Sequence, residues 1–172
     1  AEYVEVWRDD TVTVLENQNV LPHAWIVHEA VELDPTTALA QINSGAIDLK
    51  TTATVEQSPP SMSIPADAST DSVSVTHYSP DRVTIQATAA SDGLLVLSDV
   101  YDPDWSVTVD GKHAELYVVN GVLRGVALPA GTHTVSFNYE SDQLRYGLII
   151  SMVTIVGLIA FLAYVFRGSR RS

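Results

Sequence analysis

The sequence predicts a mainly β protein, an antiparallel β-sandwich of jelly-roll or immunoglobulin-like type with one short helix, followed by a single C-terminal transmembrane α-helix. Three observations predict it. Residues 1–144 alternate short runs rich in Val, Thr and Tyr with turn residues. Asp-Gly and Asn-Gly pairs separate some of these runs, as in β-hairpins. Residues 147–166 carry no charge and are followed by RGSRRS.

The alternating runs define the strands that we expect in the first 144 residues. They are residues 3–8, 11–16, 24–32, 52–57, 73–78, 82–89, 94–100, 106–110, 114–119, 123–128 and 132–139. Turns at Asp110-Gly111, Asn120-Gly121 and 129–131 predict that the second half is a meander of at least four antiparallel strands. The expected core contains Trp25, Ile85, Leu94, Val96, Trp105, Val107, Val109, Val126, Val135 and Phe137.

One helix is expected within the β region. Asp34 can cap its N-terminus, Pro35 suits the first helical position, and residues 43–45, which include Gly45, end it. Residues 58–72 are rich in Pro, Ser and Asp and predict a mobile loop. Because each half alone has too few strands for a core, we expect one domain at residues 1–144.

The apolar segment at the C-terminal end predicts a membrane span. Twenty helical residues reach about 30 Å, the thickness of a bilayer's hydrocarbon layer. Gly147, Ser151 and Thr154 fall on one helical face, a pattern that favours packing against other transmembrane helices. We therefore expect the transmembrane helix at residues 145–166 and a basic tail at residues 167–172.

The charges predict how the chain is oriented. Arg167, Arg170 and Arg171 follow the apolar segment, which marks the C-terminal side as cytoplasmic. Residues 1–145 are then extracytoplasmic, and either a removed signal peptide or earlier helices of a longer polytopic protein must export them. All 21 acidic residues precede the segment. A surface this acidic excludes nucleic acid and repels anionic lipid headgroups, and solvation alone explains it.

No catalytic motif is evident. The chain has no cysteine, its five histidines lack zinc-type spacing, and neither a nucleophile elbow nor a phosphate-binding glycine loop is present. We expect no cofactor and no catalytic residue.

The segment from Asp99 to Trp105 is the densest functional candidate. Asp99, Asp102 and Asp104 are a candidate cation site, although Asp-Pro-Asp is also a common turn. Tyr101 and Trp105 could stack on a sugar ring, although an aromatic at the edge of a sandwich is more often part of the core. The sequence leaves these alternatives open.

The second half resembles the C-terminal region of the YfhO family of bacterial membrane proteins. The run LLVLSDVYDPDWSVTVDGKHAELYVVNGVLRGVALPAGTHTVSFNYESDQLRYGLIIS follows the family's order of a "sD.yyPGW" turn, "VDGk", an "aN…rgV.vpaG.H.V.f.Y" meander and a final span. Upstream, VLENQNVLPHAWIV resembles the family's "vyeNpnaLPRaw.v" element. Asp104 stands where the family usually has glycine, and His23 stands where arginine is usual.

The resemblance implies a parent protein with a polytopic, glycosyltransferase-like core that uses lipid-linked sugars in cell-envelope glycosylation. This chain would be its non-catalytic extracytoplasmic domain, in contact with membrane lipid, with the parent's other transmembrane helices and with envelope glycan. The family's expected catalytic acids lie in early loops outside this chain. The alternatives are a single-pass surface module that binds a polymer or partner, and, with less support, an anchored hydrolase.

Overall fold

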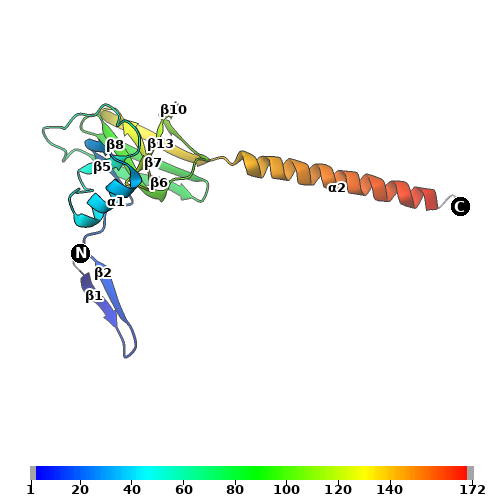
Figure 1. Cartoon of the computed structure of the whole chain (residues 1–172), viewed down its shortest axis with the longest axis horizontal. Helices are drawn as coiled ribbons and strands as arrows, with labels where there is room; N and C mark the ends of the chain where they lie inside the picture. Colours follow the sequence, from blue (N-terminus) through cyan, green and yellow to red (C-terminus); the bar gives the residue numbers. More distant parts are fainter. Residues whose placement is uncertain (1–2, 170–172) are drawn as a thin grey trace. The chain divides into compact units, whose positions relative to one another are not determined.

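The computed structural model describes residues 3–169, and for residues 142–145 and 160–169 it describes the backbone alone. The chain divides into two compact units, residues 1–138 and residues 139–172. The first unit is a β structure with one short helix, and the second is dominated by one long helix (Figure 1). The predicted mainly β class is confirmed.

The described residues form thirteen strands and two helices. They are β1 (Tyr3–Arg8), β2 (Thr13–Asn17), β3 (Ala24–Val27), β4 (Glu29–Glu32), α1 (Pro35–Ser44), β5 (Thr52–Val55), β6 (Ser72–Ser79), β7 (Arg82–Ala89), β8 (Gly93–Val100), β9 (Trp105–Val109), β10 (Lys112–Ala114), β11 (Leu116–Val119), β12 (Leu123–Leu128), β13 (Gly131–Tyr139) and α2 (Asp142–Ser169).

Two sheets enclose the main core. One has the order β10-β9-β13-β7-β6 and the other has the order β3-β8-β12-β11-β5-β4. Both contribute fully or largely buried apolar side chains to a single cluster, as expected for a sandwich. The cluster contains Ala24, Ile26, Val83, Ile85, Ala87, Ala89, Leu95, Leu97, Val107, Val126, Leu128, Val135 and Phe137.

The six-stranded sheet is curled. Its two edge strands, β3 and β4, are consecutive in the chain and separated by His28 alone, so the two edges of the sheet are joined through that residue. A second cluster fills the curl, with Trp25, Val27, Ala53, Val55, Leu94, Val96, Tyr117 and Val119. Strand β8 is therefore buried on both faces, because Leu94 and Val96 face the second cluster while Leu95 and Leu97 face the first.

The predicted turns at Asp110-Gly111 and Asn120-Gly121 are confirmed, whereas residues 129–131 lead from one sheet to the other and the meander prediction is wrong. Asp110, Gly111, Asn120 and Gly121 all have positive φ, as the Asp-Gly and Asn-Gly turns require. The chain, however, leaves one sheet between β10 and β11 and returns to it between β12 and β13, so the four predicted strands are divided between two sheets. The purely antiparallel prediction also fails at one pair, because β4 and β5 are parallel.

Helix α1 begins and ends where its sequence predicts. The Asp34 carboxylate accepts hydrogen bonds from the backbone N–H groups of Thr36 and Thr37, both at 3.1 Å. Gly45 adopts the left-handed conformation at the C-terminus, with φ of 74°. Only Ala38 of this helix is fully buried, so α1 covers little of the core.

Strands β1 and β2 form a separate two-stranded sheet. The turn between them is organised by the Asp9 carboxylate, which accepts hydrogen bonds from the N–H groups of Thr11 and Val12 at 2.7 and 2.8 Å. Large apolar side chains are exposed along both strands, Trp7 and Leu15 among them. A lone two-stranded hairpin is only marginally stable in water.

Helix α2 is continuous from Asp142 to Ser169. Among the residues whose side chains are described, no helix is both long and apolar enough to cross a membrane. The predicted span at residues 147–166 runs past Ile159 into residues 160–166, whose side chains lie outside the described ones.

Candidate functional site

A polar cluster on the sandwich is centred on Asp99, near the end of β8. Its Oδ2 atom accepts a hydrogen bond from the Arg124 Nη2 group of β12 at 2.8 Å. Its Oδ1 atom lies 3.0 Å from Nε2 of His23 and 3.4 Å from the hydroxyl of Tyr78. Residues from β6, β8, β12 and the segment before β3 thus meet at one carboxylate, which we call the Asp99 cluster.

Arg124 is the buried member of this cluster. Its side chain is 4% exposed, and its guanidinium carbon lies 3.8 Å from the centre of the Trp105 ring and 5.6 Å from that of Phe137. A guanidinium over an aromatic face is stabilised by the ring quadrupole. Burial lowers the pKa of Arg124, and the nearby Asp99 carboxylate opposes that shift by favouring the charged form.

The guanidinium is not fully satisfied by hydrogen bonds. Within the described part of the chain, Nε and Nη1 of Arg124 are buried without a hydrogen-bond partner. The charge of Arg124 therefore depends on Asp99 and on the Trp105 face. This makes the carboxylate essential to the local structure, because a buried cation without its partner is costly.

The outer part of the cluster is aromatic and polar. The rings of His23 and Tyr78 meet edge to face, with centroids 5.1 Å apart. Nε2 of His23, in the segment before β3, lies 3.0 Å from Oδ1 of Asp99 on β8. The Asp99 cluster thus ties the segment before β3 to the sandwich.

The predicted cation site is not assembled. Asp99 pairs with Arg124, whereas Asp102 accepts a hydrogen bond from the Asp104 N–H at 2.9 Å and its carbonyl accepts one from Trp105. Among the described residues, no group of three or more His, Asp and Glu side chains could hold a metal ion. The Asp-Pro-Asp segment is a turn in which the Asp102 side chain stabilises the backbone.

The predicted sugar-stacking residues differ in their surroundings. Trp105 is partly buried, packs against the main core and has the Arg124 guanidinium on one face of its ring. A sugar ring could use only the opposite face. Tyr101 is also partly exposed, and its N–H donates to the Val122 carbonyl at 2.7 Å. These surroundings favour the core alternative for Trp105, and a glycan contact stays a prediction.

The predicted helix-packing face does lie on a helix. Gly147 has no atom within 4 Å of the place where a Cβ would sit, so another helix could approach closely there. Thr154 donates its hydroxyl to the Ile150 carbonyl at 2.8 Å, which satisfies this group within the helix. Ser151 lies on the same face by its spacing and is exposed.

The sequence did not indicate Arg124 as the partner of Asp99. It lies 25 residues from Asp99, and spacing along the chain says nothing about such a contact. One signal was available: Arg124 stands in the otherwise apolar strand LRGVAL. A charged residue in a run buried on both faces needs a partner.

Comparison with known families gives one match. The family model described as "Bacterial membrane protein YfhO" matches residues 34–151. The chain belongs to the YfhO family. No curated protein and no solved structure matches the chain. The resemblance stated from the sequence is therefore confirmed.

The YfhO match covers the part of the chain that carries the Asp99 cluster. It begins at the cap of α1, includes both sheets except β3 and β4, and ends within α2. Asp99, Trp105 and Arg124 lie inside the match, whereas His23 and the hairpin β1–β2 precede it. The match to a family of bacterial membrane proteins thus covers most of the sandwich and the beginning of α2.

Proposed function

We propose that this chain is the extracytoplasmic C-terminal domain and last transmembrane helix of a polytopic YfhO-family protein that acts as a glycosyltransferase in cell-envelope glycosylation. Residues 1–145 lie outside the cytoplasm, the apolar segment 147–166 lies in the membrane, and residues 167–172 are cytoplasmic. The domain is non-catalytic: it covers the membrane core of the parent protein and helps to position an acceptor glycan.

One observation carries the membrane placement. Along α2, the large apolar side chains from Leu148 to Ile159 are each 57–69% exposed. They follow one another without a charged residue, and at 3.6 residues per turn they point to all sides of the helix. A helix at a water-facing surface would keep a polar face. Lipid tails or other apolar helices are the surroundings that such a helix needs.

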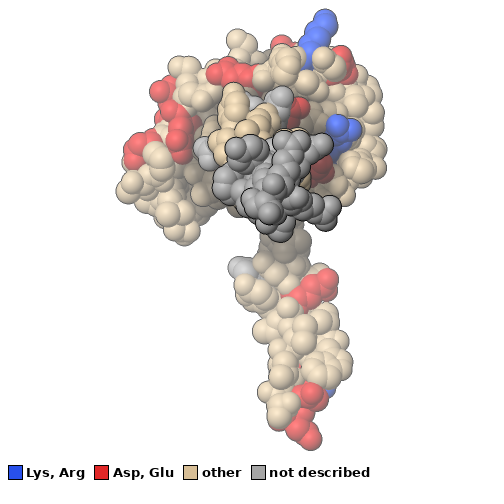
Figure 2. All heavy atoms as spheres, turned by 90° about the vertical axis from the view of Figure 1, so that its right-hand side faces the viewer, with Lys and Arg blue, Asp and Glu red and all other residues tan. Residues whose placement is uncertain are grey.

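The charge distribution supports the orientation. Arg167, Arg170 and Arg171 follow the apolar segment, and cytoplasmic flanks of membrane spans are rich in arginine and lysine. Acidic side chains are scattered over the face seen in Figure 2, with few basic side chains between them. An acidic domain of this kind stays soluble beside an anionic membrane surface without adhering to it.

The Asp99 cluster supports the non-catalytic role. The carboxylate of Asp99 is paired with Arg124 and also contacts His23 and Tyr78, so the cluster is committed to holding strands together. A general acid or base needs a titratable group that is free to exchange a proton with a substrate. We therefore attribute the transfer chemistry to other parts of the parent protein, as the YfhO resemblance implies.

Cysteine labelling tests the proposed topology. The 172 residues contain no cysteine, so Ser61→Cys in the exposed segment after β5 and Gly168→Cys in the tail each add one thiol to them, in a full-length protein from which any other cysteine has been removed. In intact cells that express the full-length protein, a membrane-impermeant maleimide is expected to label position 61 and to reach position 168 only after permeabilisation. Labelling of position 168 in intact cells, or protection of position 61, would contradict the proposed orientation.

A further inference from the structure

The sandwich is joined to α2 at one of its two ends. β13 finishes at Tyr139 and α2 begins at Asp142, so two residues connect them. β9 begins beside the end of β13, because the Ser106 hydroxyl donates to the Asn138 carbonyl at 3.3 Å. β8 of the other sheet leads to β9 through residues 101–104, so β8 also finishes at this end. We call it the α2-linked end.

Three large apolar or aromatic side chains at the α2-linked end are exposed. They are Tyr78 near the end of β6, Val100 at the end of β8 and Val122 in the turn before β12, and each is 57–70% exposed. The Tyr78 hydroxyl lies 3.4 Å from Oδ1 of Asp99, the residue before Val100. The Val122 carbonyl accepts a hydrogen bond from the N–H of Tyr101, the residue after Val100. We call Tyr78, Val100 and Val122 the end residues.

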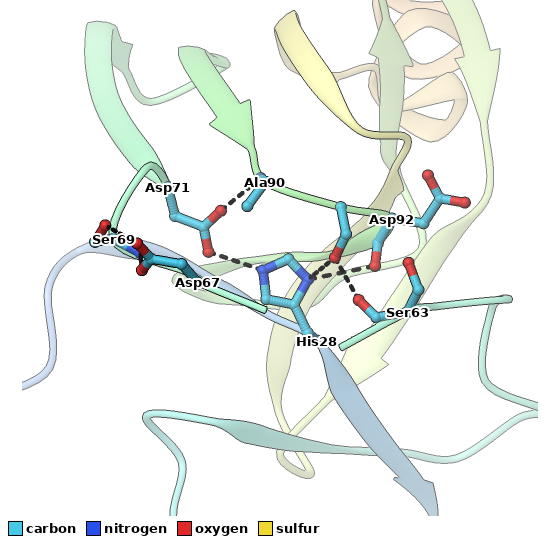
Figure 3. A network of polar contacts seen from close by, with 8 residues as sticks. His28, Ser63, Asp67, Ser69, Asp71, Ala90 and Asp92 are labelled. Carbon is cyan, nitrogen blue, oxygen red and sulfur yellow. Dashed lines mark hydrogen bonds and ion pairs between the residues drawn. The ribbon is translucent and has the colours of Figure 1, made fainter. Parts of the chain in front are cut away.

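The opposite end of the sandwich is held together by polar groups (Figure 3). The His28 ring lies 2.8 Å from an Asp71 oxygen and 3.1 Å from the Ser91 hydroxyl. The Asp92 carboxylate accepts a hydrogen bond from the N–H of Ala130, in the turn before β13. β13 has nine residues, so at about 3.4 Å per residue this turn lies about 27 Å from the α2-linked end.

The short connection keeps the α2-linked end near the proposed membrane. Two connecting residues span at most about 11 Å, and residues 142–146 add about 7 Å along α2 before the apolar segment begins. The headgroup layer is about 5–7 Å thick on each side of the hydrocarbon. When residues 147–166 span the hydrocarbon, the α2-linked end therefore lies within about 12 Å of the headgroups.

The chemistry of this end fits a headgroup layer without net charge. Tyrosine is enriched at membrane interfaces, where its ring meets apolar groups and its hydroxyl meets water. Exposed valines gain from leaving water for the same layer. Asp81, Asp102 and Asp104 lie in turns at this end and outnumber the nearby Arg82. These carboxylates repel anionic lipid and leave zwitterionic headgroups as the matching partner.

We propose that the α2-linked end of the sandwich rests in the interfacial layer of the membrane, with the end residues among zwitterionic headgroups. The inference rests on the proposed membrane placement of α2 and adds a second contact with lipid. This contact fixes the sandwich against the lipid surface, whereas the two connecting residues alone leave it free to turn.

Quenching of fluorescence by labelled lipid tests the contact. The 172 residues contain no cysteine, so Val122→Cys, Ala130→Cys and Ile150→Cys each provide one labelling site for a fluorophore. Each labelled chain is placed in phosphatidylcholine vesicles that carry a nitroxide near the top of the acyl chain. Interfacial groups lie about 5–10 Å into the boundary between headgroups and acyl chains, so quenching at position 122 should be at least about twofold greater than at position 130. Position 150 of α2 should be quenched strongly.

A charge at an end residue tests whether apolar contact, rather than nearness alone, causes the quenching. Val100→Asp should reduce the quenching at position 122 by about half or more, because a carboxylate is costly to remove from water. Ile64→Asp is the matched control. Ile64 is also highly exposed, but it follows Ser63, whose N–H donates to the Asp92 carbonyl at the opposite end. This control should leave the quenching at position 122 unchanged.

The outcomes separate this inference from the proposed function. Equal quenching at positions 122 and 130, or quenching at position 122 that is insensitive to Val100→Asp, would overturn the inference. With position 150 quenched, the membrane placement of α2 would still stand. If position 150 is not quenched, the proposed membrane placement is wrong and the inference is wrong with it.

Discussion

The pairing of Asp99 with Arg124 predicts an asymmetry between two substitutions. Asp99→Asn removes the charge that compensates a guanidinium whose side chain is 4% exposed. Breaking a buried ion pair from one side costs about 3–5 kcal/mol. Because the Asp99 side chain is 15% exposed, we expect about 3 kcal/mol, at the lower end of that range.

Arg124→Met is expected to be the milder change. It removes the buried cation and its contact with Trp105, an interaction that contributes about 1–2 kcal/mol. The remaining Asp99 carboxylate keeps its contacts with His23 and Tyr78. The double variant, Asp99→Asn with Arg124→Met, should be more stable than Asp99→Asn alone. It leaves no buried charge without its partner.

The free energy of unfolding, measured by urea titration of the four proteins, tests this reasoning. Asp10→Asn, which removes an exposed carboxylate of the β1–β2 turn, serves as the control and should change stability little. The reasoning is refuted if Arg124→Met costs more than Asp99→Asn, or if the double variant is the least stable of the set.

Two further predictions concern packing and pH. Gly125→Ala would place a Cβ 2.4 Å from Cγ2 of Val119, so it should lower the free energy of unfolding by about 1–3 kcal/mol in the same titration. The control Gly147→Ala, whose Cβ would have nothing within 4 Å, should leave it unchanged. Equal effects of the two substitutions would contradict the close approach of β12 to β11. Hydrogen bonds lower the pKa of Asp9, Asp34, Asp67, Asp81 and Asp110, the last chiefly through the His133 ring. Carboxyls with a lowered pKa stabilise the fold at pH values above their unfolded pKa of about 4. The free energy of unfolding should therefore decrease as the pH is lowered below about 4, and Asp110→Asn should make this decrease smaller. A free energy of unfolding that does not change in this acid range would contradict the prediction.

Local signals predicted local structure well. Asp34, Pro35 and Gly45 define α1, and each acts through contacts within a few residues of itself. The positive φ of Asp110 and Asn120 follows equally from Asp-Gly and Asn-Gly pairs. These features need no knowledge of the rest of the fold.

Features that depend on distant strands were not predicted. Apolar and polar residues alternate in the same way along β9 to β13 whichever sheet a strand joins. The sequence pattern therefore could not predict that the chain crosses between the two sheets. The run from residue 24 to residue 32 reads as one strand, but its two parts lie at opposite edges of one sheet and meet at His28. The partners of Asp99 and His28 are likewise remote in sequence, 76 residues away for His23 and 43 for Asp71.

The attachment of the sandwich to a membrane through the apolar segment is the central claim, and extraction at alkaline pH tests it most directly. The chain is expressed behind a cleavable export signal, beside a variant with Ile150→Asp and Ile155→Asp, two exposed positions of α2. Charges at these depths are costly in lipid. We expect the wild-type chain to stay in the membrane pellet and the variant to be released with a folded sandwich. Release of the wild-type chain would contradict the proposed anchoring.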